Sequence, residues 1–84
     1  MLFRSLEWHP TALRNLEKLP KQTIKRVLDK FDQVVEEPFR YLEHYEGENL
    51  YKIRIGDYRA LVEVQLENQT MFVRVFGHRG RVYK

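Results

Sequence analysis

Apolar and polar residues alternate through residues 51–55 and 58–66, on either side of Gly56-Asp57. This pattern predicts a β-hairpin, because every second side chain of a strand points to the same face. Glycine in the first position of a two-residue loop is typical of a type II′ turn. The pairs that then face each other are Ile55 with Tyr58, Arg54 with Arg59, and Lys52 with Leu61.

The hairpin gathers basic side chains on one face, where Arg54 lies opposite Arg59 and two residues from Lys52. Like charges in facing positions destabilise a sheet. Either the long side chains diverge into solvent, or an anion binds between them. We favour an anion site, because a bound anion removes the repulsion that the pairing creates.

Upstream of the hairpin, the pattern predicts a strand and two helices. Residues 2–8 alternate as a strand, and Pro10 suits the first position of a helix that ends before Pro20. A second helix runs from there to Pro38, which stops it. One face of the strand carries Leu2, Leu6 and Trp8. The apolar face of the second helix consists of Ile24, Val27, Leu28, Phe31, Val34 and Val35.

Residues 39–49 have no clear period and predict a loop, whereas residues 71–78 alternate again and predict a last strand. A polar turn over residues 67–70, with Leu66 opposite Met71, sets the register of the second hairpin. The resulting pairs on the helix-facing side are Val64 with Val73 and Val62 with Val75. Those on the solvent-facing side are Glu63 with Arg74, Leu61 with Phe76, and Arg59 with His78.

These elements predict an α+β fold: an N-terminal strand, a helical hairpin, then a three-stranded antiparallel meander, with the helices packed on one face of the sheet. Residues 1–84 are enough for a single small domain. The chain has no cysteine, no apolar run that could span a membrane and no signal-peptide pattern at its start. We therefore expect a soluble cytoplasmic protein with no membrane partner.

Charge is divided unevenly along the chain. Residues 1–49 contain eight Lys and Arg against nine Asp and Glu, whereas residues 50–84 contain seven against three. A basic segment of this kind indicates a polyanionic partner. Basic side chains beside Phe76 on the solvent-facing side favour single-stranded RNA, because phosphates need cations and unstacked bases need flat apolar surfaces.

Two motifs resemble those of the RelE toxins of the RelE/ParE superfamily: the segment 51–59, and the segment 75–79 before a terminal Val82-Tyr83. The resemblance covers nearly the whole chain. It implies a type II toxin that inhibits translation as a ribosome-dependent mRNA endonuclease without a metal or other cofactor. It also implies a cognate small antitoxin as partner, and mRNA in the ribosomal A site as substrate. The matching site residues are Lys52, Arg54, Arg59, His78, Arg79 and Tyr83.

The reaction expected of such residues is attack of a ribose 2′-hydroxyl on the neighbouring phosphate, helped by fixed cations. Either Lys52 or His78 is the base, and either Arg79 or Tyr83 is the acid. Two alternatives remain open: a ParE-like inhibitor of DNA gyrase without nuclease activity, and an inactive RNA- or protein-binding module of the same fold.

Overall fold

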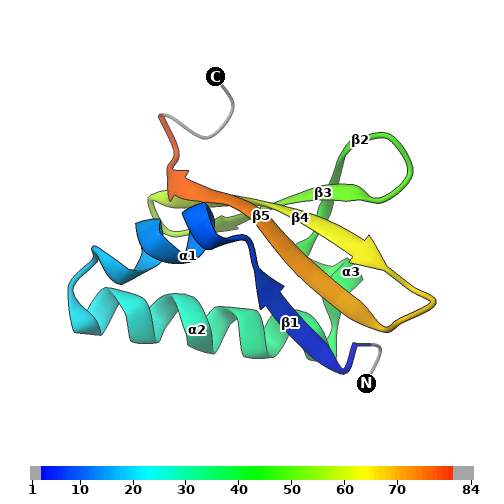
Figure 1. Cartoon of the computed structure of the whole chain (residues 1–84), viewed down its shortest axis with the longest axis horizontal. Helices are drawn as coiled ribbons and strands as arrows, with labels where there is room; N and C mark the ends of the chain where they lie inside the picture. The colour runs from blue at the N-terminus through cyan, green and yellow to red at the C-terminus, as the bar shows by residue number, and fades with distance from the viewer. Residues whose placement is uncertain (1–2, 81–84) are drawn as a thin grey trace.

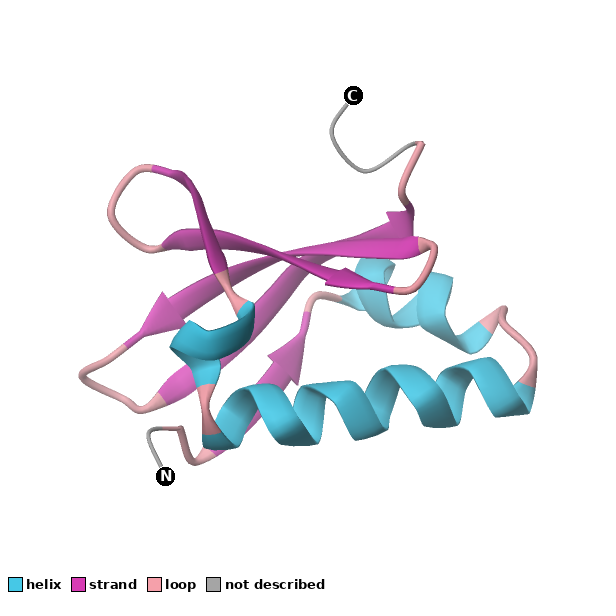
Figure 2. Cartoon of the chain, turned by 180° about the vertical axis from the view of Figure 1, so that it is seen from behind, coloured by secondary structure: helices cyan, strands magenta, loops and turns pink. Residues whose placement is uncertain are grey.

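The computed structural model describes residues 3–80. Its elements in chain order are β1 (Ser5–Trp8), α1 (Pro10–Glu17), α2 (Lys21–Glu36), α3 (Pro38–Tyr41), β2 (Glu43–Glu46), β3 (Leu50–Ile55), β4 (Tyr58–Gln65) and β5 (Thr70–His78). The strands form one sheet in the order β1-β5-β4-β3-β2. β1 runs parallel to β5, and the other neighbours are antiparallel. α1 and α2 lie under one face of the sheet (Figures 1 and 2). The α+β fold and the one-sided helical hairpin are confirmed.

The helices begin and end where the sequence predicts. The ring of His9 accepts a hydrogen bond from the backbone N–H of Thr11 at 3.1 Å, which caps α1. Pro20 separates the two helices, and Pro38 follows the end of α2. The buried face of α2 is narrower than predicted, because Leu28 is 40% exposed.

The core lies between the helical hairpin, formed by α1 and α2, and the sheet. Trp8 joins its layers, because its ring packs edge-on against Phe31 of α2 at 5.3 Å and against Phe76 of β5 at 5.8 Å. The buried sheet residues on this side include Ile53, Ile55, Ala60, Val62, Val64, Met71 and Val73. The opposite face of the sheet is therefore the one left open by the helices.

The register of the first hairpin is confirmed. Ile55 pairs with Tyr58, Arg54 with Arg59, and Lys52 with Leu61. Gly56 has a φ of +59°, the left-handed value that glycine adopts without a steric penalty. The alternation and the glycine in the turn were thus sufficient to predict this pairing.

The predicted register of the second hairpin is wrong. Val64 pairs with Met71, Val62 with Val73, Ala60 with Phe76, and Tyr58 with His78. A bulge opposite the Leu61/Val62 step leaves Arg74 without a partner in the ladder. The extra residue reverses the alternation beyond it. Phe76 consequently enters the core at 1% exposure, while Val75 is 37% exposed.

The segment predicted as a loop contains α3 and β2. All four residues of β2 are exposed, so their pattern carries no burial signal. Pairing with β3 holds the strand instead, with Glu43 opposite Lys52 and His44 opposite Tyr51. β1 is shorter than the predicted strand, and Leu2 lies outside the described residues. No helix within residues 3–80 combines the length and apolar character that crossing a membrane requires.

Candidate active site

A cleft of about 460 Å³ opens on the sheet face turned away from the helices. Three of the predicted site residues meet in it because Lys52 and Arg54 alternate along β3 and Arg59 pairs with Arg54 across the hairpin. Arg79, just beyond β5, joins them. The complete lining is Glu43, Lys52, Ile53, Arg54, Arg59, Arg79 and Gly80.

Arg59 is the most tightly held cation of the cleft. Arg59 lies on the predicted face, opposite Arg54, but the residue is only 8% exposed, so the expected exposure to solvent is wrong. The guanidinium donates hydrogen bonds to the carbonyl oxygens of Gly56 at 3.2 Å and Tyr58 at 3.0 Å. These bonds tie the charge to the turn of the first hairpin and leave it aimed into the cleft.

Arg79 reaches the cleft because the end of β5 is bound to the same turn. The backbone N–H of Arg79 donates to the carbonyl oxygen of Asp57 at 2.9 Å. This contact brings a residue 20 positions after Arg59 in sequence to the same cleft. The cations therefore come from both strands of the first hairpin and from the segment after the last strand.

His78 lies on the other face of the sheet, contrary to the prediction. The bulge places it opposite Tyr58, whose ring it contacts edge-on at 6.0 Å. It lines a separate hollow with Asn15 of α1 and with Lys18, which directly follows that helix. Phe76 also leaves the predicted surface and stacks on Tyr58 in the core. Tyr83 lies outside the described residues.

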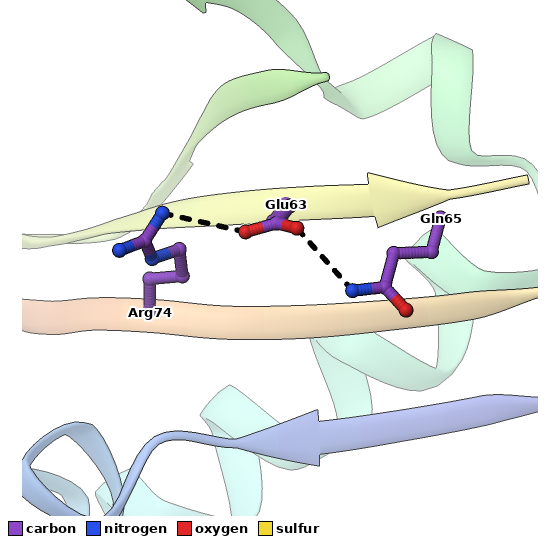
Figure 3. A network of polar contacts seen from close by, with 3 residues as sticks. All are labelled: Glu63, Gln65 and Arg74. Carbon is purple, nitrogen blue, oxygen red and sulfur yellow. Dashed lines mark hydrogen bonds and ion pairs between the residues drawn. The ribbon is translucent and has the colours of Figure 1, made fainter.

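Two carboxylates on the cleft side differ in their partners. Glu63 forms the predicted ion pair with Arg74 at 3.3 Å and also accepts a hydrogen bond from Gln65 at 3.2 Å (Figure 3). Glu43 lines the cleft itself, directly opposite Lys52. Sequence reasoning missed Glu43 because its segment has no period, and the edge strand that positions it was predicted as a loop.

A second hollow of about 480 Å³ lies between α2 and the end of β3, and Arg54 lines both. Lys25 of α2 lines this hollow and forms an exposed ion pair with Asp29 at 2.9 Å. The hydrogen bond and the charge of that carboxylate raise the pKa of Lys25. Basic residues thus continue past Arg54 onto the helical side.

The cleft is strongly electropositive for its size. Four cations and one carboxylate leave it a net charge of +3, which equals the net charge of the whole chain. Guanidinium groups match the geometry of phosphate oxygens and stay charged at any physiological pH. The arrangement is suited to hold a phosphodiester and to stabilise additional negative charge on it.

The model of the ParE toxin of the type II toxin–antitoxin system parDE matches residues 6–83. A search of curated protein sequences found no significant match.

Several solved structures share the fold. A chain of the archaeal RelE–RelB complex from Pyrococcus horikoshii OT3 is 28% identical, with a TM-score of 0.80, over 98% of this chain and 100% of that one. A chain of the toxin–antitoxin complex RelBE2 from Mycobacterium tuberculosis is 28% identical, with a TM-score of 0.80, over 94% of both chains. The isolated RelE toxin of E. coli, at 24% identity and a TM-score of 0.78 over 99% and 89%, shows the same fold.

Proposed function

We propose that this chain, which belongs to the ParE toxin family within the RelE/ParE superfamily of type II toxins, cleaves mRNA in the ribosomal A site. The observation that carries the proposal is the cleft around Arg59. A buried arginine whose guanidinium is already held by two carbonyl oxygens needs no reorganisation to meet a phosphate.

In this function the 2′-hydroxyl of one nucleotide attacks the phosphate that follows it. Negative charge then grows on the phosphate oxygens, and the guanidinium groups of Arg54, Arg59 and Arg79 stabilise it. Lys52 adds a fourth positive charge from the same face. Of the two bases expected from sequence, Lys52 lines the cleft and His78 does not.

The ribosome is expected to hold the mRNA in the geometry that cleavage requires. An open cleft on an 84-residue chain has little area with which to force a flexible RNA into line for attack. We expect isolated protein to cut naked RNA poorly and ribosome-bound mRNA efficiently. The site of action is then the cytoplasm, where translation takes place.

A neutralising antitoxin is the second expected partner. The Pyrococcus and Mycobacterium relatives were solved as toxin–antitoxin complexes. An antitoxin with acidic segments that cover the cleft would neutralise its net positive charge, and their association would slow as salt is added.

Inhibition of DNA gyrase is the competing function, and the ParE description of the matching family model favours it. The two functions leave different traces in cells that express the chain. Primer extension on cellular mRNA reveals new 5′ ends inside codons if the chain is a nuclease. Plasmid supercoiling changes, with mRNA intact, if the chain inhibits gyrase. The proposal predicts the first result, and the second would overturn it.

A further inference from the structure

We infer that Glu43 is the general base of the cleft and accepts the proton of the attacking 2′-hydroxyl, while Lys52 stays charged and serves as a cation. This inference rests on the proposed nuclease function. It starts from the position of Glu43, the one carboxylate among residues 3–80 that lines the cleft.

The neighbours of Glu43 hold it on the cleft side. Leu42 is buried in the core, and the ring of His44 packs edge-on against Tyr51 at 5.6 Å. The His44 ring also hydrogen-bonds the carbonyl oxygen of Gly47 across the β2–β3 turn. With both flanking side chains on the helix side, the alternation of the strand turns Glu43 to the opposite face, beside Lys52.

Glu63 of β4, a carboxylate on the same face of the sheet, is already engaged. Glu63 is held by Arg74 on one oxygen and by Gln65 on the other, so its lone pairs are partly occupied (Figure 3). No hydrogen bond or ion pair within 4.0 Å is found for the Glu43 carboxylate among the described residues. It is therefore free to turn toward a bound ribose.

The chemistry favours a carboxylate over a lysine. A lysine must lose its own proton before it can accept one, whereas a glutamate side chain is ordinarily ionised at neutral pH. The charged groups that face Glu43 across the cleft are Lys52 and Arg54 of β3, Arg59 of β4 and Arg79 after β5. All four are positively charged, and all four attract the phosphate that is attacked by the 2′-oxygen.

Glu43 takes the proton from the 2′-hydroxyl while the 2′-oxygen forms a bond to phosphorus. The bond between phosphorus and the 5′-oxygen breaks, and that oxygen takes up a proton from water. The products are a 2′,3′-cyclic phosphate and a 5′-hydroxyl, and Glu43 then returns its proton to solvent.

The test compares three purified proteins on ribosomes programmed with a defined mRNA. Glu43→Gln keeps the shape of the side chain and removes the base. Glu46→Gln, in the same strand, removes the same charge from a residue that does not line the cleft. Single-turnover cleavage is measured between pH 5 and pH 9, and binding to the programmed ribosomes is measured alongside.

We expect Glu43→Gln to cleave about 100-fold to 10,000-fold more slowly than wild type, the range that a general base contributes. Its binding should be unchanged or tighter, because a negative charge has left the cleft. Wild-type cleavage should slow toward acid pH as the carboxylate takes up a proton, and this dependence should vanish in Glu43→Gln. Glu46→Gln should behave like wild type.

Contrary outcomes separate this inference from the proposed function. If wild type cleaves and Glu43→Gln cleaves within about threefold of it, Glu43 is not the base, yet the nuclease stands. If Glu43→Gln loses activity but its cleavage still slows toward acid pH as in wild type, Glu43 only positions Lys52. That result also overturns the inference. If wild type leaves the mRNA intact, the proposed function fails and this inference fails with it.

Discussion

Replacing Arg59 with alanine should unfold the protein more easily as well as inactivate it. The reason is structural: the guanidinium bridges the carbonyl oxygens of Gly56 and Tyr58 at the β3–β4 turn, and the residue is only 8% exposed. Loss of activity in Arg59→Ala can therefore be interpreted only once the stability of the variant is known. For an arginine exposed to solvent, a loss of activity could have been assigned to the site directly.

The expected loss follows from the two hydrogen bonds. A bond from a charged donor contributes about 1.5–3 kcal/mol. The same guanidinium nitrogen donates both bonds, and water can replace it at the two acceptors of the turn. We therefore count the pair as one such bond near the lower end of that range, about 2 kcal/mol. For a domain of this size such a loss lowers the melting temperature by about 8–16 °C.

Arg54→Ala is the matched control, because Arg54 faces Arg59 across the hairpin but is exposed. Removing it also removes repulsion, so its stability should change by less than about 0.5 kcal/mol. Thermal and urea unfolding followed by circular dichroism measure both variants. If Arg59→Ala melts within about 2 °C of wild type, the turn does not depend on the guanidinium and the reasoning is refuted.

Further expectations concern the turn, the helical surface and the cleft. Gly56→Ala should lower the free energy of unfolding in urea by about 1–2 kcal/mol, because a φ of +59° strains alanine. Gly80→Ala, at a position with no positive φ, should be nearly neutral. Asp29→Asn should lower the pKa of Lys25 in an NMR titration, because the carboxylate raises it. Any stability from that pair is present below the unfolded pKa of Lys25 and is lost as pH rises through the folded pKa. Any difference in melting temperature between wild type and Asp29→Asn should therefore be seen at neutral pH and disappear in strong alkali. Arg54→Lys should slow growth arrest in expressing cells without abolishing it, because the charge stays but the planar fork is lost; full toxicity would show that the fork is unnecessary.

The first hairpin was predictable from sequence because two local signals agree there. Strict alternation predicted which side chains share a face, and Gly56 predicted the position of the turn. Together they predicted the pairing of Arg54 with Arg59. Arg79 joined the same cleft as the resemblance implied, through a backbone contact to Asp57 that no local pattern encodes.

The register of the second hairpin was not predictable from alternation alone, because the bulge at Arg74 is determined by how side chains pack in the core. Without the bulge, Phe76 would face solvent and Val75 the core. With it, the larger ring is buried against Trp8 and Tyr58, at the cost of exposing a valine. Burial of the larger apolar surface outweighs an unbroken ladder. His78 changes face as a consequence, which removes it from the cleft.

Glu43 was missed for a different reason. An exposed edge strand buries no face, so its sequence has no period to detect, and only pairing with β3 reveals it. The bulge could have been predicted from the preference of large apolar side chains for the core. The edge strand has no comparable local signal.

We expect the cleft to cut mRNA only when the ribosome presents it. The direct measurement adds purified wild-type protein and Arg79→Ala to the same mRNA, naked or on programmed ribosomes, and maps the new 5′ ends. Arg79→Ala is the inactive control because the side chain of Arg79 is exposed. Its contact with the turn is made by the backbone N–H, which alanine retains. We expect cuts inside the A-site codon with wild type on ribosomes, and few or none on naked mRNA or with Arg79→Ala. Rapid cutting of naked mRNA at many positions, or an intact message on ribosomes, would contradict it.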